Sequence, residues 1–134
     1  MSTCKVCGCT DEQACPGGCY WVDTKHSVCS ACYGNIMHAI NTGLKAVLFK
    51  EDGSVEYLSP KAKYFTLKEL QASVKGLIEI YPASYRDHLI VCNEEGIMRG
   101  FRINTTFKLI TGIGLLGNVL LCPKEIFEEP EDDK

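Results

Sequence analysis

The pattern that decides the fold of the N-terminal part lies in residues 4–32. They read CKVCGCTDEQACPGGCYWVDTKHSVCSAC and hold seven of the nine cysteines in this 134-residue chain. Aliphatic side chains are scarce in residues 1–32, where Val6, Val22 and Val28 are the main exceptions. A segment so poor in apolar surface does not bury enough area to stay folded without a cross-link. The sequence therefore predicts that its cysteines hold this segment together.

Two Cys-x-x-Cys pairs frame the segment and are typical of a zinc site. The first pair is Cys4 and Cys7, followed by Gly8, and the second pair is Cys29 and Cys32. Two tight turns of this kind present four thiolates tetrahedrally to one ion. If the second pair begins a helix, as in treble-clef fingers, the helix N-terminus favours the thiolate charge. We expect one Zn²⁺ at these four cysteines.

A second set of potential ligands lies between the two pairs. It contains three further cysteines and one histidine: Cys9, Cys15, Cys19 and His26. Four such side chains complete the coordination of a tetrahedral ion. The sequence therefore allows a second Zn²⁺ in the same module.

Other cysteine chemistries remain open. A disulfide framework is less consistent, because seven is an odd number and no secretory segment is visible. An iron–sulfur cluster also takes thiolates, and the closely spaced Cys7-Gly8-Cys9 suits one. A thioredoxin-type pair is disfavoured, since Cys-x-x-Cys occurs twice without a βαβ context. An iron–sulfur or thiol redox protein is therefore an alternative to a zinc protein.

The composition changes at Leu44, where strand-like apolar runs separated by glycine and charged turns begin. We divide the chain into a metal-binding module with a C-terminal helix at residues 1–43, a core domain at 44–123 and an acidic tail at 124–134. The expected class is α+β: a small zinc-stapled treble-clef or ribbon-like module, then a mostly antiparallel sheet with one packed helix.

Two helices are predicted from their capping residues. Ser30 is a candidate N-cap for a helix over residues 31–41, with Gly43 in its C-terminal capping region. Thr66 and Glu69 have the spacing of a capping box and predict a short helix up to about residue 75.

The strands are predicted from short apolar runs. Asp52-Gly53 between residues 45–50 and 55–58 indicates a hairpin. Four more strands are expected at residues 77–81, 88–92, 97–103 and 118–122.

The core domain offers one candidate acid–base group. Asn93, Glu94 and Glu95 precede Gly96, and Glu79 interrupts a neighbouring apolar run. Paired carboxylates support acid–base chemistry when burial separates their pKa values. The stretch Asn93-Glu-Glu-Gly96 is also typical of a polar hairpin turn with Gly96 at positive φ, and we favour this interpretation. Period-two alternation places Glu79 on the solvent face.

A basic and aromatic stretch suggests nucleic acid as a second ligand class. Arg99, Arg102 and Lys108 alternate with Phe101 and Phe107, a mixture that suits single strands. The core domain has only a small excess of basic residues, so the more ordinary interpretation is a solvated face.

Two parts of the chain resemble proteins of bacteriophages and prophages. The seven cysteines and Cys-Pro-Gly-Gly-Cys at residues 15–19 match a cysteine-rich module found in uncharacterised phage proteins. Residues 44–122 resemble a small phage-borne domain of unknown function through Lys45-Ala-Val-Leu-Phe, Val74-Lys-Gly-Leu-Ile-Glu79, Asn93-Glu-Glu-Gly96 and Asn104. The resemblance implies a phage product acting inside a bacterial host and brings no established activity.

These observations lead to an expected function. The net charge of −3 gives no general attraction to nucleic acid or membrane, and no apolar run is long enough to span a bilayer, so we expect a cytoplasmic protein. We expect a non-enzymatic phage accessory protein that binds a host protein or small signalling ligand and alters a host factor or counters host defence. A nucleic-acid-binding regulator is the alternative. Candidate partner-binding residues are Glu79, Asn93, Glu94, Arg99, Arg102 and Asn104.

Overall fold

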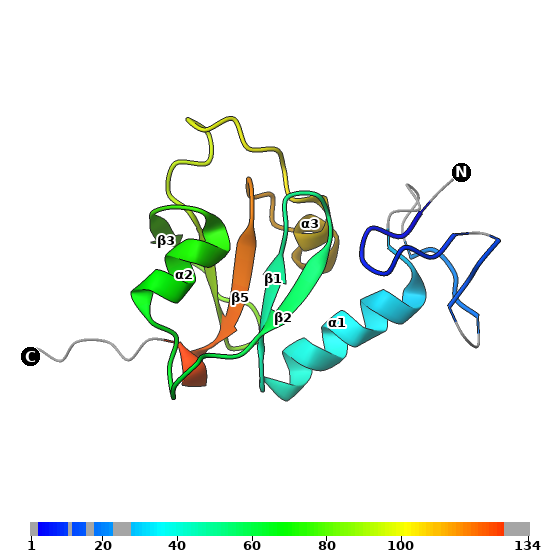
Figure 1. Cartoon of the computed structure of the whole chain (residues 1–134), viewed down its shortest axis with the longest axis horizontal. Helices are drawn as coiled ribbons and strands as arrows, with labels where there is room; N and C mark the ends of the chain where they lie inside the picture. Colours follow the sequence, from blue (N-terminus) through cyan, green and yellow to red (C-terminus); the bar gives the residue numbers. More distant parts are fainter. Residues whose placement is uncertain (1–2, 11, 16–17, 23–27, 128–134) are drawn as a thin grey trace, which may run out of the picture.

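Within the described part of the chain, the fold centres on an open five-stranded antiparallel sheet (Figure 1). The computed structural model describes residues 3–10, 12–15, 18–22 and 28–127. Along the chain the strands are β1 (Ala46–Phe49), β2 (Val55–Leu58), β3 (Ile78–Ile80), β4 (His88–Asn93) and β5 (Val119–Pro123). Their order across the sheet is β2-β1-β5-β4-β3. The predicted α+β class is confirmed.

The β1–β2 hairpin forms where Asp52-Gly53 predicted it. Ala46 pairs with Leu58 and Phe49 with Val55. The Asp52 carboxylate accepts hydrogen bonds from the Ser54 N–H at 2.9 Å and the Ser54 hydroxyl at 2.6 Å. Gly53 has φ +97°, a conformation that side chains with a Cβ rarely adopt.

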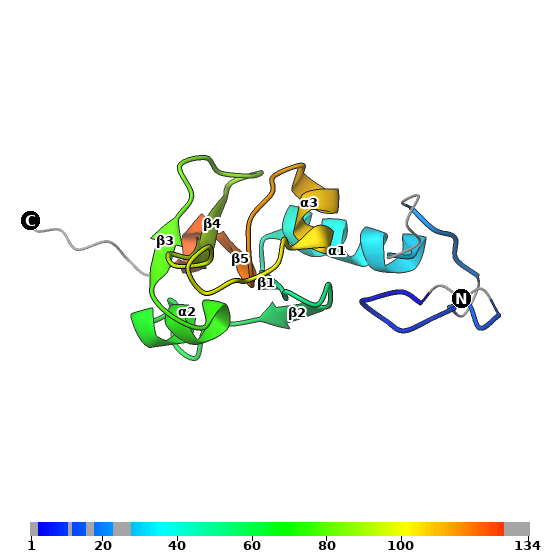
Figure 2. The same cartoon turned by 90° about the horizontal axis from the view of Figure 1, so that it is seen from above.

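Helices cover both faces of the sheet within the described residues, whereas the sequence predicted one packed helix. Helix α1 (Ser30–Thr42) and helix α3 (Thr105–Thr111) lie on one face, and helix α2 (Leu67–Val74) lies on the other (Figure 2). Strand β1 is buried along its whole length because side chains on both of its faces are covered.

The two cores on either face have different partners. On the α1 and α3 face, Ile36 and Ile40 of α1 join Phe107 of α3 against strand residues such as Phe49. The rings of Phe49 and Phe107 meet edge to face at 5.3 Å. On the other face, α2 packs its Leu70 and Val74 on the sheet, and residues 124–126, a 3₁₀ turn, place Ile126 beside them. Residues 128–134 of the predicted tail lie outside the described residues.

Helix α2 confirms the capping-box prediction. The Thr66 hydroxyl accepts from the Glu69 N–H at 3.1 Å, and the Glu69 carboxylate accepts from the Thr66 N–H at 2.8 Å. Helix α1 ends at Gly43 with φ +66°, as its sequence indicated. Its N-cap is Cys29 rather than Ser30, which occupies the first helical position.

The predicted strand at residues 97–103 is wrong. Residues 94–100 form consecutive turns, and Ile103 makes an isolated bridge to Leu116. The turn predicted at residues 93–96 is present, but it does not close a hairpin, and Gly96 is not among the residues with positive φ. The sequence also missed α3, whose N-cap is Asn104.

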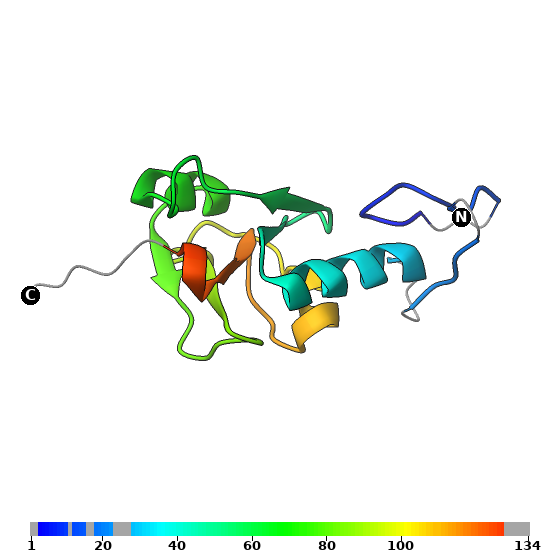
Figure 3. The ribbon, with the colours of Figure 1, turned by 90° about the horizontal axis from the view of Figure 1, so that it is seen from below.

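The described residues that precede α1 lie at one end of the molecule, beyond the first turn of that helix (Figure 3). Helix α1 runs from this segment to the sheet and so joins the two parts. In the described part of the chain, no helix has the length and apolar character that a membrane crossing requires.

Candidate metal centre and surface groove

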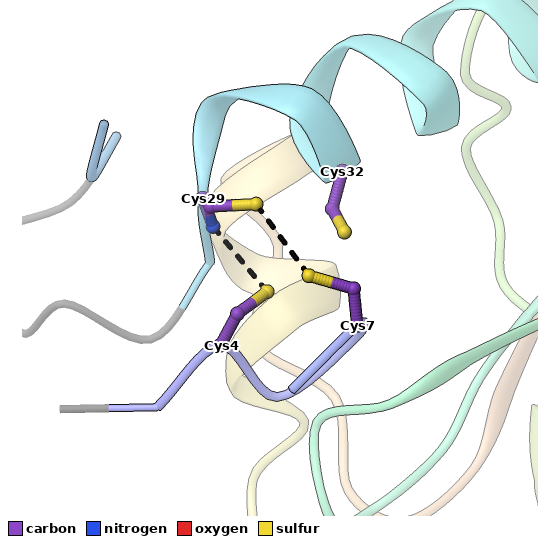
Figure 4. Close-up of side chains that lie close together, drawn as sticks. All are labelled: Cys4, Cys7, Cys29 and Cys32. Atoms are coloured by element: carbon purple, nitrogen blue, oxygen red, sulfur yellow. Dashed lines mark hydrogen bonds between the residues drawn. The ribbon is translucent and has the colours of Figure 1, made fainter. Parts of the chain in front are cut away.

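Cys4, Cys7, Cys29 and Cys32 converge on one point (Figure 4). All four Sγ atoms lie within 4.8 Å of one another, and the Sγ atoms of Cys7 and Cys29 are 3.8 Å apart. Cys4, Cys29 and Cys32 are buried, and Cys7 is exposed. The two Cys-x-x-Cys pairs therefore form one compact group of thiols that a tetrahedral metal ion fits.

Backbone N–H groups orient the first pair. The Cys4 Sγ accepts from the Val6 N–H and from the Cys29 N–H, each at 3.4 Å. The turn closes with a hydrogen bond from the Gly8 N–H to the Cys4 carbonyl at 2.9 Å, and Gly8 adopts φ +85°. Such donors hold a thiolate in place and spread its charge, as the surroundings of metal ligands commonly do.

The second pair gains its position from α1. Cys29 is the N-cap of the helix and Cys32 lies in its first turn. The positive end of the helix dipole therefore faces both thiols. Because Ile36 and Ile40 fix the rest of α1 against the sheet, the second pair is attached to the main core.

A second group of thiols adjoins the first. It consists of Cys7, Cys9, Cys15 and Cys29, whose Sγ atoms also lie within 4.8 Å of one another. Cys19 lies beside this group: its Sγ is 3.7 Å from the Cys9 Sγ and accepts from the Cys15 N–H at 3.4 Å. His26, a predicted ligand of a second ion, lies outside the described residues.

The thiols shift one another's pKa in opposite directions. Burial opposes ionisation of Cys29, but hydrogen bonds from the Cys32 backbone and the neighbouring thiols lower its pKa to about 6. The pKa of Cys7 is lowered by the same competition. Hydrogen bonding to Cys7, together with burial, raises the pKa of Cys15 to about 12. Burial, then the neighbouring thiols, raises the pKa of Cys9 and of Cys32.

This pattern has a simple electrostatic cause. Thiolates packed this closely repel one another, so ionisation of one thiol favours the neutral form of the next. A bound cation removes that repulsion and allows the whole group to ionise.

The remaining two cysteines lie in the sheet. Cys92 and Cys122 are buried. Burial, with a smaller contribution from Glu79, raises the pKa of Cys92 to about 11, and burial raises that of Cys122 to about 12. Both are neutral thiols at pH 7.

A groove of about 490 Å³ lies at the β3–β4 side of the sheet. It contains Glu79, Asn93 and Glu94, three residues that the sequence singled out, and also Glu95. Glu79 and Glu94 form no ion pair with any described residue. The groove therefore has acidic side chains that are free to meet a cation.

Asn93 shapes the groove from within the fold. Its side-chain amide donates to the Val74 carbonyl at 2.9 Å and to the Lys75 carbonyl at 3.3 Å, and its oxygen accepts from the Glu95 N–H at 2.7 Å. It thereby ties the end of α2 to the turn that follows β4.

The other predicted binding residues are distributed elsewhere. Arg99 pairs with Glu95 at 3.6 Å, and Arg102 pairs with Glu51 at 3.7 Å. Asn104 is fully buried, and its amide hydrogen bonds are made within the fold. The structure thus brings Glu79, Asn93 and Glu94 together, with Arg99 next to Glu95, and places Arg102 and Asn104 apart from them.

Sequence reasoning missed the apolar part of the groove. Ile97 and Met98 line it and are 83% and 85% exposed. The sequence predicts a strand here, in which one of the two side chains would face the core. The signal that indicates otherwise is the run of turn-forming residues 93–96 on one side and Gly100 on the other.

The core domain matches a known family model. Residues 44–130 match the domain of unknown function (DUF3846), and the match begins just after α1. No curated protein and no solved structure matches the chain.

Proposed function

The chain belongs to the family of this domain of unknown function (DUF3846), and we propose that it is a zinc-stabilised accessory protein that binds a host protein through the acidic groove. The observation that carries the binding function is the combination of free carboxylates with exposed apolar side chains in one groove. The zinc module stabilises the fold and takes no part in a reaction.

The thiol distances support Zn²⁺ at the first group. Zinc binds thiolates at about 2.3 Å, so the edge of a regular tetrahedron of sulfurs is about 3.8 Å long. The Cys7 and Cys29 Sγ atoms are 3.8 Å apart. Four protein thiolates close the site, which is the usual composition of a structural zinc site.

An iron–sulfur cluster fits these distances less well. In a cubane cluster each thiolate binds a different iron, and inorganic sulfide lies between the irons. The thiolates then point away from a bulky centre, whereas the four Sγ atoms of the first group lie within 4.8 Å of one another. The geometry favours a single ion at their centre.

The apolar part of the groove supports a protein partner. Ile97 and Met98 protrude from the turns after β4, and Leu115 and Leu116 line the groove beside them. Exposed apolar side chains with a polar rim are typical of protein-binding surfaces. Methionine is common there because its flexible side chain adapts to different contacts.

The acidic rim defines the chemistry of that partner. Glu79 and Glu94 have no cationic partner among the described residues. An extended segment that alternates lysine or arginine with aliphatic residues satisfies both the carboxylates and the apolar floor. The resemblance of this chain to phage-borne proteins supports a bacterial host protein as the source of that segment.

Cys92 and Asn93 give the groove no evident catalytic group. Cys92 is the one thiol among the described lining residues, and with a pKa of about 11 it is a poor nucleophile at pH 7. The polar atoms of Asn93 are already hydrogen-bonded within the fold.

The two arginines of the basic stretch give less support to nucleic-acid binding. Arg99 and Arg102 each pair with a glutamate, and Lys50 pairs with Glu56 at 3.1 Å. Cations that are already paired attract phosphate less strongly.

A peptide titration tests this function. The probes are two short peptides of equal length, one alternating lysine with leucine and the other alternating glutamate with leucine, and the signals are the methyl resonances of Ile97 and Met98. The lysine peptide should shift both resonances, and the double variant Glu79→Lys, Glu94→Lys should weaken its binding by about tenfold or more.

Glu56→Lys is the matched control, since it reverses a carboxylate on β2, away from the groove, and should leave the affinity unchanged. Equal binding of both peptides, or shifts confined to another surface, contradicts the proposal. Tight, salt-sensitive binding of a mixed single-stranded oligonucleotide would favour the nucleic-acid alternative instead.

A further inference from the structure

The two groups of thiols share two members, Cys7 and Cys29. We propose that the module holds two Zn²⁺ ions in one cluster, in which the sulfurs of Cys7 and Cys29 bridge both ions. The terminal ligands are Cys4 and Cys32 for one ion, and Cys9 and Cys15 for the other. The inference rests on the proposed zinc occupancy of the first group and extends it to a second ion.

Three distances between Sγ atoms describe one face of the proposed second tetrahedron. The Sγ atoms of Cys7 and Cys15 are 3.7 Å apart, those of Cys7 and Cys29 are 3.8 Å apart, and those of Cys15 and Cys29 are 3.8 Å apart. This nearly equilateral triangle has the edge of about 3.8 Å that zinc–thiolate bonds require. Cys9 completes the group of four.

The Cys7–Cys29 edge belongs to both groups. A sulfur atom that lies at a corner of two tetrahedra has lone pairs for two ions. The two groups therefore describe two tetrahedra joined along one edge, with the metal positions on either side of it.

The number of ligands also favours sharing. Two separate tetrathiolate sites need eight cysteines, and residues 1–32 contain seven. Two bridging sulfurs reduce the requirement to six. The six described side chains of the two groups supply that number without a histidine.

Cys19 is then a neighbour of the cluster and not a ligand. It belongs to neither group of four. Its Sγ accepts the Cys15 N–H and lies 3.7 Å from the Cys9 Sγ. This differs from the sequence expectation, in which Cys9, Cys15, Cys19 and His26 form a separate second site.

Bridging also reduces the accumulated negative charge. Six thiolates and two Zn²⁺ ions carry a formal charge of −2, with each bridging sulfur neutralised from two sides. The Cys4 sulfur, a terminal ligand, instead receives two backbone N–H groups. In this arrangement two metal ions compensate the charge of a bridging sulfur, and backbone N–H groups compensate that of the terminal Cys4 sulfur.

Cadmium substitution tests the bridges in the full wild-type chain. The protein is loaded with ¹¹³Cd²⁺, and correlations between cysteine β-protons and ¹¹³Cd are recorded. We expect two ¹¹³Cd resonances, with the β-protons of Cys7 and Cys29 correlated to both. Two resonances with no shared cysteine, or with Cys19 in place of a bridge, would overturn the cluster.

The same experiment separates the two proposals. One ¹¹³Cd resonance correlated with Cys4, Cys7, Cys29 and Cys32 alone overturns the bridged cluster and leaves the structural zinc site standing. A chain that binds no metal overturns both. The groove titration remains an independent test of partner binding.

Metal counting by native mass spectrometry gives a second, variant-based test. Wild-type protein and the control Cys122→Ser should carry two Zn²⁺ ions. Cys9→Ser should retain one ion, because the other four-thiolate group is intact. Cys7→Ser should weaken the binding of both ions. At a chelator concentration that leaves one ion bound to Cys9→Ser, Cys7→Ser should therefore lose both of its ions. Equal retention by the two variants would show that Cys7 serves a single ion.

Discussion

The sheet domain and the cysteine module differ in how many large apolar side chains they bury. The sheet domain buries large side chains on both faces of one sheet, such as Phe49 and Phe107 on one face and Leu70 on the other. The buried cluster of the module contains three cysteines and a single aliphatic residue, Val28. Burial of Phe49 or Leu70 contributes about 1.5–3 kcal/mol, whereas a short segment without such residues depends on cross-links. The difference supports our proposal that metal coordination takes the place of packing in the module.

Helix α1 belongs to both regions. Its N-terminal turn carries Cys32, and its middle and end bury Ile36 and Ile40 against the sheet. A helix of this length is marginal by itself, so each end depends on a different kind of contact. This helix is where the two means of stabilisation meet.

The largest expected effect is the loss of the metal site. In the double variant Cys4→Ser, Cys29→Ser, residues 3–10 and 18–22 should lose their ordered NMR signals, because the apparent free energy of structural zinc binding is about 10–16 kcal/mol. Residues 44–123 should keep a cooperative thermal transition. A single joint loss of both regions would show that the sheet domain also depends on the metal.

Removal of a core aromatic side chain should destabilise the sheet domain and leave the cysteine module intact. Phe107→Ala leaves a cavity between α3 and the sheet and should lower the free energy of unfolding by about 3–5 kcal/mol in urea. The zinc content at low temperature should not change, because Phe107 belongs to the core cluster at the sheet and not to the buried cysteine cluster. Loss of zinc together with this destabilisation would contradict separate stabilisation.

Asn104 tests the polar connection between α3 and the sheet. Its oxygen accepts from the Phe107 N–H at 3.0 Å, and its amide donates to the Phe49 and Gly117 carbonyls, each at 2.8 Å. Asn104→Ala should lower the free energy of unfolding by about 2–4 kcal/mol, since a cap and two buried acceptors lose their partner. Asn104→Asp keeps the cap acceptor but places a buried carboxylate oxygen against two carbonyls, so at pH 7 it should destabilise the fold at least as much as alanine. A smaller loss in the aspartate variant than in the alanine variant would assign most of the effect to the cap.

The smallest expected effect is the pH dependence of the α2 cap. The hydrogen bond from the Thr66 backbone lowers the pKa of Glu69 below its ordinary value of 4.5. A lowered folded-state pKa means that the carboxylate stabilises the fold fully above pH 4.5 and loses this effect as the pH falls through the folded value. Glu69→Gln should remove this dependence from urea titrations at pH 3–6.

Thr66→Ala is the comparison for that measurement. It removes the other half of the capping box, so it should cost about 1 kcal/mol at pH 7 and reduce the same acid dependence. An unchanged pH profile in both variants would show that the capping box does not couple to acid stability. Zinc content should be unaffected in either variant.

Local chemistry made much of the fold predictable. Asp52-Gly53 fixed the hairpin, and Thr66 with Glu69 fixed the start of α2, because each pattern stabilises its turn through contacts a few residues apart. The two cysteine pairs were predictable for the same reason, since their spacing is set by a tight turn.

The features that were missed depend on distant contacts. Residues 97–103 contain strand-forming side chains, but no neighbouring strand pairs with them in the described sheet, and burial rather than propensity selects a strand. Asn104 carries the signal for α3, with Phe107 and Ile110 at helical spacing and Gly112 after them. Its donors, however, meet carbonyls at Phe49 and Gly117 that only the folded sheet brings near.

The shared cysteines were also beyond prediction from spacing. The sequence order suggests two successive ligand sets, whereas the structure places Cys7 and Cys29 in both groups of thiols. The groove residues Glu79 and Glu94 come together for a similar reason: β3 pairs with β4 in the sheet.

Amide hydrogen exchange of the wild-type chain, with zinc bound and after its removal by a chelator, tests the central claim most directly. The account predicts that protection at residues 3–10 and 28–32 disappears with the metal while protection of β1, β4 and β5 persists. Undiminished protection of the N-terminal segment in metal-free protein would contradict the claim that coordinated ions replace a core there.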